Sequence, residues 1–298
     1  MAGVSQKNGL LCTALGAITW GINGAVTQFL FMHYTVNAAW LTSMRMILAG
    51  IILIITVWPT HRQQFRLLFS DSHDVFRVCL FAIFGLLWSQ YSYLSAIKYS
   101  NSGTATVLQT LSIVLMAIYI AFRHRALPVP REMLSIVLAV GGVFLIATNG
   151  SISSLVISPL GLFWGLMAAV GAVTYPLLSH DLAWRWHASV VNGPSMLIGG
   201  MALLLVLQLW QYTPTLDVIG WLAVAFIIIV GTAISFTLFI RGISEIGPMK
   251  GTLIATLEPV VATAASVVWL GTVFHPTELI GFVFILTTVF LLVLRRHS

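Results

Sequence analysis

Charged side chains are scarce in this chain of 298 residues. Only 7% of its residues are Asp, Glu, Lys or Arg, whereas 59% are apolar. A soluble domain carries about 25% charged residues, and a surface in contact with water cannot be built from so few. The composition therefore excludes a soluble enzyme or binding domain. The net charge of +6 is not concentrated on a soluble domain either, so we expect no nucleic-acid partner.

The chain also lacks the short motifs of catalytic and nucleotide-binding sites. It contains no HExxH zinc motif, no GxSxG nucleophile elbow and no GxxxxGKS/T phosphate-binding loop. Cys12 and Cys79 fall within apolar segments, and the eight histidines fall in loops or near segment ends. We therefore expect no catalytic residues, no metal site, no cofactor and no ATP-driven step within this chain.

Long apolar runs dominate what is present. Ten of them are long enough to cross a bilayer core of about 30 Å, namely 9–31, 37–58, 76–97, 103–122, 132–148, 159–178, 188–210, 218–240, 250–270 and 276–294. A transmembrane barrel would show alternating segments of about ten residues, and these runs are continuously apolar. The predicted fold is an all-α polytopic membrane protein with ten transmembrane helices, the first of them retained and not cleaved as a signal peptide.

Lys and Arg are distributed asymmetrically between the predicted loops. If both termini are cytoplasmic, twelve of the fourteen Lys and Arg residues fall at inner helix ends or in inner loops. Lys98 alone falls in an outer loop, and Arg45 lies within a helix. Because cytoplasmic loops are rich in Lys and Arg, the distribution predicts cytoplasmic N- and C-termini and supports an even number of helices.

The second half of the chain resembles the first. Residues 93–147 align without a gap on residues 239–293, and the identical pairs include Thr106–Thr252, Thr110–Thr256, Pro130–Pro276 and Glu132–Glu278. Each half would hold five helices, an odd number, so the second half enters the membrane from the opposite side. We predict two inverted five-helix repeats, residues 1–150 and 151–298. Secondary transporters use such repeats around a site near the midplane; a duplication kept for folding alone is the alternative.

Several short stretches carry a family resemblance over essentially the whole chain. They are Trp20-Gly21, Arg45 with Ala49-Gly50, Ser102 through Thr106, Gly247-Pro248, Leu257-Glu258-Pro259 and Glu278 through Gly281. In this order and spacing, the chain resembles EamA-type members of the drug/metabolite transporter superfamily. The resemblance implies helices 1, 3, 4, 6, 8 and 9 around a central cavity. It also implies a multi-pass protein of a bacterial inner membrane that moves small metabolites, often exporting amino acids or related compounds. The chain departs from the family at Ser112-Ile113, where a proline matching Pro259 is common.

Glu258 is the only acidic residue deep inside a predicted membrane segment. It lies about eight residues from the segment start at Lys250, roughly 12 Å into the hydrocarbon core, where burying a carboxyl costs on the order of 2.5 kcal/mol or more. Pro259 should kink or loosen the helix near Ala255, because it has no N–H and clashes with the carbonyl four residues earlier. We predict that Glu258 binds substrate or couples transport to protons and that Pro259 forms a hinge. A structural acid paired with Arg45 is the alternative.

Arg45 and Gln109 are further polar side chains at membrane depth. The Arg45 guanidinium suits a substrate carboxylate. The second helix is, however, not among the cavity helices that the resemblance implies, so we favour a structural role in an ion pair with Glu258 or in contacts with backbone carbonyls. Gln109 shares a helix face with Thr106 and Thr110, and its amide needs partners. It is a candidate for the cavity lining, whereas the threonines fit close helix packing equally well.

Aromatic side chains supply the remaining candidates for substrate contacts. The third helix carries Trp88 and Tyr91 in a run of polar and aromatic residues, and their shared face would stack a planar or apolar group. Trp20 in the first helix and Tyr175 in the sixth would extend this wall. The alternative is that these residues anchor helices at the membrane interfaces, where Trp and Tyr are enriched.

These features predict a secondary transporter that moves a small metabolite by alternating access. The favoured substrate is an amino acid or a similar compound, with efflux as the direction and with proton coupling through Glu258 as one way to drive it. Transport of cationic drugs or quaternary amines is the second interpretation, and a channel is the third. The expected partners are a small-molecule substrate and the lipid bilayer. One chain holds both halves of the expected pathway, so a monomer would suffice.

Overall fold

The computed structural model describes residues 2–123, 125, 129–151 and 155–293, without the side chains of residues 2–6, 183, 184, 248, 249 and 252. Thr252, the predicted repeat partner of Thr106, thus has its side chain outside the described residues. Within these ranges, ten helical segments are long and apolar enough to cross a membrane. The predicted all-α fold with ten transmembrane segments is confirmed.

Several of these segments are divided into shorter elements. In chain order the elements are α1 (Ala2–His33), α2 (Ala38–Ser70), α3 (Ser72–Leu80), a π-helix η1 (Phe81–Leu87), α4 (Trp88–Tyr99), α5 (Ser102–Thr110), α6 (Ser112–Arg123), α7 (Pro130–Thr148), α8 (Pro159–Arg185), α9 (Ala188–Val206), a short 3-10 turn η2 (Leu209–Gln211), α10 (Val218–Ile228), a second π-helix η3 (Ile229–Ile234), α11 (Ser235–Ile246), α12 (Pro248–Ala255), α13 (Leu257–Leu270) and α14 (Pro276–Val293).

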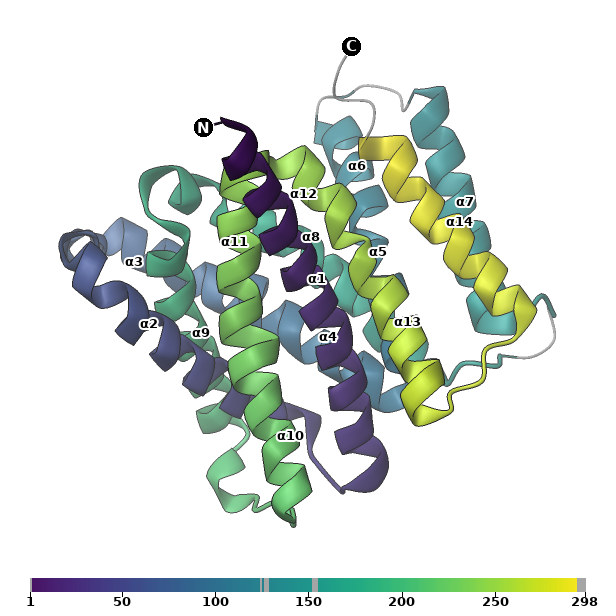
Figure 1. Cartoon of the computed structure of the whole chain (residues 1–298), viewed down its shortest axis with the longest axis horizontal. Coiled ribbons are helices and arrows are strands. Elements are labelled where there is room, and N and C mark those ends of the chain that lie inside the picture. The colour runs from purple at the N-terminus through teal and green to yellow at the C-terminus, as the bar shows by residue number, and fades with distance from the viewer. Residues whose placement is uncertain (1, 124, 126–128, 152–154, 294–298) are drawn as a thin grey trace.

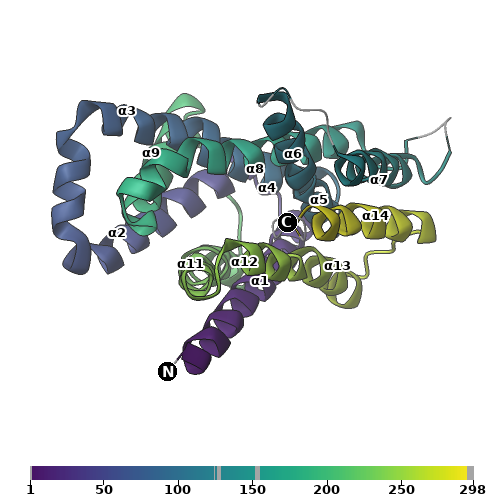
Figure 2. The ribbon, with the colours of Figure 1, turned by 90° about the horizontal axis from the view of Figure 1, so that it is seen from above.

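Helices of the two halves pair with each other throughout the bundle. The main packing pairs are α2 with α9, α7 with α14, α1 with α11, and α4 with α8. In both ribbon views the α7–α14 pair lies at one edge of the molecule, and α2, α3 and α9 lie at the other (Figures 1 and 2). The start of α1 and the end of α14 lie on the same side (Figure 1). We call this the inner side, following the charge distribution.

Matching local features recur in the two halves. The Glu132 carboxylate accepts a hydrogen bond from the N–H of Val129 (2.9 Å), and the Glu278 carboxylate accepts one from the N–H of His275 (2.8 Å). Each glutamate therefore caps a helix that begins with a proline, at Pro130 and Pro276. The two π-helices, η1 and η3, also occupy corresponding positions in the third and eighth transmembrane segments. These features support the internal repeat that the sequence predicts.

The fourth and ninth transmembrane segments both break near their middle. Helix α12 ends at Ala255 and α13 begins at Leu257, which is the break expected from Pro259. The fourth segment breaks as well, between α5 and α6, although it has no proline there. At this break the N–H of Leu111 binds the carbonyl of Leu108, three residues back (3.1 Å). The departure from the family at Ser112-Ile113 thus leaves the break in place.

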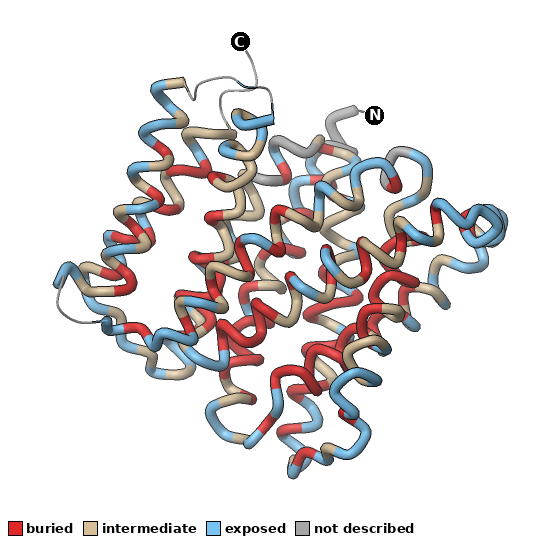
Figure 3. The backbone as a smooth tube through the Cα atoms, turned by 180° about the vertical axis from the view of Figure 1, so that it is seen from behind, coloured by how far each residue is buried: buried red, intermediate tan, exposed pale blue. Residues whose placement is uncertain are grey.

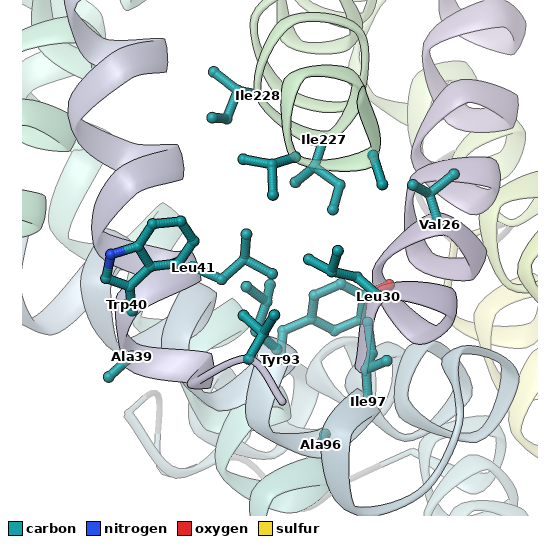
Figure 4. Close-up of a cluster of buried hydrophobic side chains, with 14 of the residues drawn as sticks. Val26, Leu30, Ala39, Trp40, Leu41, Tyr93, Ala96, Ile97, Ile227 and Ile228 are labelled. Atoms are coloured by element: carbon teal, nitrogen blue, oxygen red, sulfur yellow. The ribbon is translucent and has the colours of Figure 1, made fainter. Parts of the chain in front are cut away.

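Buried residues concentrate along the middle of the bundle, where the halves meet (Figure 3). One buried cluster fills the space between α1, α2, α4 and α10 and includes Leu30, Leu41, Ile97 and Ile227, all at most 2% exposed (Figure 4). This cluster lies toward the outer ends of α1 and α4. It packs these helices together beyond the polar cavity described below.

The α7–α14 pair is held by a close glycine contact. A Cβ added to Gly142 would lie 2.8 Å from the carbonyl oxygen of Gly281, and a Cβ on Gly281 would lie 2.8 Å from that of Gly142. Small residues let membrane helices approach this closely. Gly142→Ala should therefore destabilise the protein by about 1–3 kcal/mol, measured as a lower thermal unfolding midpoint in detergent. Gly141→Ala is the matched control, because its Cβ would meet nothing nearer than 3.7 Å. Equal midpoints would contradict this account of the packing.

The first turn of α9 is capped by a histidine on the inner side. Nδ1 of His187 accepts a hydrogen bond from the N–H of Ser189 (3.3 Å), and its imidazole packs at a tilt against that of His61, with a centroid distance of 4.4 Å. Partial burial, and secondarily the charge of His61, lower the pKa of His187 below its ordinary value. A neutral Nδ1 is required to accept the bond. The cap is therefore present above about pH 6.5, the ordinary pKa of histidine, and is lost as the pH falls through the lower folded value.

Hydrogen exchange should reveal this loss. After correction for the intrinsic pH dependence of exchange, amides in the first turn of α9 should exchange faster at pH 5.5 than at pH 7.5. His187→Asn retains an N-cap side chain that does not titrate in this range, and this variant should show no such change. The same pH dependence in both proteins would exclude His187 as its source.

Candidate functional site

A cavity of about 360 Å³ lies where the two halves meet. It is lined by Trp20, Asn23, Arg45, Ser89, Gln90, Tyr93, Gln109, Ala172, Tyr175, Phe236, Phe239, Ile240, Ile243 and Glu258. These residues come from α1, α2, α4, α5, α8, α11 and α13. They represent all six transmembrane segments that the family resemblance implies, and α2 in addition. The cavity extends toward the inner side, because Ile243 lies within the last turn of α11.

Arg45 reaches the cavity from α2 and is only 5% exposed. Its Nη2 donates a hydrogen bond to Oε1 of Gln90. Its Nη1 is buried and has no hydrogen-bond partner among the described residues. Leaving a buried donor unpaired costs about 1–3 kcal/mol, and more for a charged group. One terminal nitrogen of the guanidinium, Nη2, is therefore hydrogen-bonded, and the other, Nη1, is available to an anionic group in the cavity.

Glu258 lines the same cavity from the first turn of α13, directly after the break in the ninth segment. The described residues show neither a hydrogen bond to its carboxyl nor an ion pair within 4.0 Å to Arg45. The two charges do interact electrostatically across the cavity, without direct contact. A carboxyl at the N-terminus of a helix is favoured by the helix dipole. The break caused by Pro259 gives Glu258 this position in the middle of a transmembrane segment.

Further polar groups surround these two charges. Asn23 is 3% exposed, and its Oδ1 has no partner among the described residues. The hydroxyl of Tyr93 is paired with that of Thr106 (2.8 Å), and the hydroxyl of Tyr175 donates to Oδ1 of Asn192 (3.3 Å). Asn23 was not predicted from the sequence, although its spacing from Trp20 places both residues on one helix face.

One wall of the cavity is aromatic. Trp20 packs edge-on against Phe236, with ring centroids 5.1 Å apart, and tilted against Phe239 at 4.6 Å. Tyr175 contributes a ring from α8 and packs edge-on against Phe81 at 5.1 Å. The cavity therefore offers apolar surface beside its charged groups, an arrangement typical of small-molecule sites.

Of the residues predicted from the sequence, the structure brings Trp20, Arg45, Gln109, Tyr175 and Glu258 together in this cavity. Pro259 follows directly on the chain and is buried.

Trp88 and Tyr91, the other two predicted aromatic residues, do not line the cavity. Trp88 is 42% exposed and donates from Nε1 to the carbonyl of Met167 (3.2 Å), and Tyr91 packs edge-on against Trp164. Ser89, Gln90 and Tyr93 of the same helix face the cavity instead. All of these residues lie within the regular helix α4, so packing against the other helices decides which face of α4 meets the cavity.

A second cavity, of about 400 Å³, lies between α6, α7 and α8 and is lined only by apolar side chains, Val114, Ile118 and Val140 among them. It has no polar group to orient a metabolite. The cavity with Arg45 and Glu258 is thus the candidate functional site.

The family comparison agrees with this arrangement. The model of the EamA-like transporter family matches residues 7–148 and again residues 159–294, once in each half. The chain belongs to the EamA-like transporter family. A curated member of similar sequence is described as the uncharacterized inner membrane transporter YicL of Salmonella typhimurium. It is 30% identical over 299 residues, which cover 99% of this chain and 98% of the relative.

EamA membership and this relative make the protein a multi-pass transporter of a bacterial inner membrane and not an enzyme. The chain is similar to a solved crystal structure with a TM-score of 0.62 and 20% sequence identity. The match covers 98% of this chain and 99% of the chain in that structure. At this identity the likeness supports the fold alone. The overall fold of this chain is therefore shared with a solved structure, and its family membership rests on the sequence comparisons.

Proposed function

We propose that this EamA transporter is a secondary carrier of an amino acid or an amino-acid-like zwitterion. The proposal rests on two opposite charges in one cavity, the guanidinium of Arg45 and the carboxyl of Glu258, each of which can form a further bond to a ligand. Nη1 of Arg45 has no hydrogen-bond partner among the described residues. The carboxyl of Glu258 makes no ion pair within 4.0 Å there, although it interacts electrostatically with Arg45. A substrate carboxylate would pair with the first and a substrate ammonium with the second.

The size and the walls of the cavity fit such a substrate. Ligand cavities range from about 300 to 1,000 Å³, and a volume of about 360 Å³ is at the small end of this range. The rings of Trp20 and Phe239 provide apolar surface for a side chain of the substrate. A small amino acid with an apolar or aromatic side chain matches these properties.

Glu258 also provides a route to proton coupling and efflux. If protons and the substrate ammonium compete for this carboxyl, entry of a proton from outside promotes release of the substrate there. The carrier would then work as an antiporter that alternates between inward and outward access. Saturable flux would distinguish such a carrier from a channel.

A carrier of cationic drugs or quaternary amines is the second candidate function. Glu258 and the aromatic wall would attract a cation. Arg45 lies in the same cavity, however, and would repel a substrate that carries only positive charge. A zwitterion satisfies both charges and is therefore preferred.

A thermal-shift screen of the purified protein in detergent tests the proposal. Amino acids, their amides, aromatic amines and quaternary amines would be compared at pH 6 and pH 8. A ligand at a hundredfold excess over its dissociation constant stabilises the native state by about 2.7 kcal/mol. We expect zwitterions to raise the unfolding midpoint more than amides or amines that lack the carboxylate. Stabilisation by amines alone would support the second candidate.

A further inference from the structure

A third pocket, of about 330 Å³, lies beyond the central cavity on the outer side. It is formed at the outer ends of α1, α4 and α13, and Gln28, Phe31, Lys98, Asn101 and Thr272 belong to its lining. Lys98 is the single Lys or Arg that the charge distribution places in an outer loop. Its Nζ donates to the carbonyl of Val36 (3.1 Å) and lies 5.8 Å from the ring of Phe31.

Gln28 forms the floor of this pocket and the centre of a buried hydrogen-bond cluster. Its Oε1 accepts hydrogen bonds from the N–H of Ser102, the hydroxyl of Ser102 and the hydroxyl of Ser266, each at 2.9 Å. Its Nε2 donates to the hydroxyl oxygen of Thr272 (2.9 Å), and the hydroxyls of Thr272 and Ser266 are hydrogen-bonded to each other (2.6 Å). The side chain is only 5% exposed. We call Gln28, Ser102, Ser266 and Thr272 the Gln28 cluster; it ties α1, α5 and α13 together.

The Gln28 cluster lies close to the central cavity. Gly24 lies one turn before Gln28 on α1. A Cβ at Gly24 would be 3.1 Å from the hydroxyl oxygen of Tyr93 and 3.3 Å from Cβ of Ser102. Tyr93 lines the central cavity, and Ser102 belongs to the Gln28 cluster. Gly24 therefore lies between a residue of the central cavity and a residue of the Gln28 cluster.

We propose that the transport path runs from the central cavity past Gly24 into the outer pocket, and that the Gln28 cluster is its closed outer barrier. This inference rests on the proposed function as a carrier. To release substrate outward, α1 must separate from α5 and α13 at this level, which breaks the bonds of Gln28. Water that enters the gap can form hydrogen bonds to the separated polar groups, so opening a polar contact costs little net free energy. Separated apolar side chains gain no such bonds, and exposing them to water is unfavourable. A polar cluster is therefore suited to opening and closing repeatedly.

The outer pocket would then hold the substrate on its way out. Lys98 attracts the substrate carboxylate after it leaves Arg45, and the amide of Asn101 lies in the same lining. An amino-acid-like zwitterion thus meets a cationic group in both compartments of the path.

A reversible cross-link across the barrier tests this path. Cβ of Ala262 lies 3.9 Å from the position of a Cβ at Gly24, within the range of about 3.5–4.5 Å found in disulfides. Gly24→Cys with Ala262→Cys would be made in a Cys12→Ser, Cys79→Ser background. Oxidation should lower counterflow in proteoliposomes at least 20-fold, and a reductant should restore it. The oxidised protein should still show the ligand-induced thermal shift, because the central cavity stays intact. Each single cysteine variant is the control and should not respond to oxidation.

Transport at an unchanged rate through the oxidised double variant would overturn the proposal. It would show that α1 and α13 need not separate.

A second measurement requires no substrate and remains informative if the proposed substrate class is wrong. Ser89→Cys in the same background places a thiol in the central cavity. In right-side-out vesicles, Gln28→Ala should raise the rate of labelling by an impermeant maleimide at least 5-fold, because it removes the centre of the barrier. Gln211→Ala, an exposed residue outside both pockets, is the matched control. An unchanged labelling rate in Gln28→Ala would overturn the barrier assignment independently of any ligand.

Discussion

Transport by the Glu258→Gln variant should fall by about 30-fold to several thousand-fold in proteoliposomes, and the remaining flux should no longer depend on a proton gradient. Truncating one partner of a buried charge pair costs about 2–5 kcal/mol, and each 1.4 kcal/mol is a factor of ten. In the proposed mechanism, Glu258 is the partner of both the substrate ammonium and the coupling proton. Glutamine keeps the shape of the side chain and removes both functions. Counterflow and gradient-driven uptake would be measured on the same preparations.

Glu245→Gln is the matched control for this experiment. Glu245 lies at the inner end of α11, outside the cavity lining, and pairs with Arg241 at 3.6 Å. The same chemical change there should leave the proton dependence intact. If Glu258→Gln transports at the wild-type rate with the same proton dependence, Glu258 has a structural role, and the proposed coupling is wrong.

Arg45→Gln should weaken binding of zwitterionic substrates by a similar factor and remove the preference for a carboxylate. In the wild type, an amino-acid amide should bind much more weakly than the amino acid, since Nη1 of Arg45 would have no anion to pair with. In Arg45→Gln the two ligands should bind about equally. Arg45→Lys retains the charge but loses the planar fork, and it should show an intermediate preference. Calorimetry in detergent would give the dissociation constants for each pair.

The stability of Arg45→Gln separates binding from folding. The guanidinium is buried with one unpaired nitrogen, so its removal need not destabilise the protein. We expect an unfolding midpoint in the absence of ligand that is equal to the wild type or higher. Tyr91→Phe, which changes a residue outside the cavity, should alter neither the midpoint nor the ligand preference. Trp88→Phe also removes the hydrogen bond to Met167, and it should leave the ligand preference unchanged. A large loss of stability together with unchanged ligand preference would assign Arg45 a structural role.

The course of the chain through the membrane follows from properties that are local in sequence. The apolar runs predict ten segments because the length of the hydrocarbon core acts on each run separately, and the described part of the chain has ten such helical segments. The break after Ala255 follows from the missing N–H of Pro259. The repeated Pro and Glu pairs, Pro130 with Glu132 and Pro276 with Glu278, cap α7 and α14 in the same way because a cap involves only neighbouring residues. Glu258 is a candidate functional residue from the sequence because an isolated carboxyl is costly at its depth.

Only the tertiary structure decides which side chains meet in the cavity. The sequence alone places Arg45 on a helix outside the expected lining, yet α2 brings it there, and its Nη2 binds Gln90. Trp88 and Tyr91 point elsewhere because packing turns the face of α4 that carries Ser89 and Tyr93 toward the cavity.

The contacts of Gln28 with Ser102 and Ser266 join residues that are far apart in the chain. Hydropathy and helix breaks act on neighbouring residues and can be read from the sequence. The angle and rotation of each helix depend on packing against the others, and the cavity and its outer barrier therefore exist only in the assembled bundle.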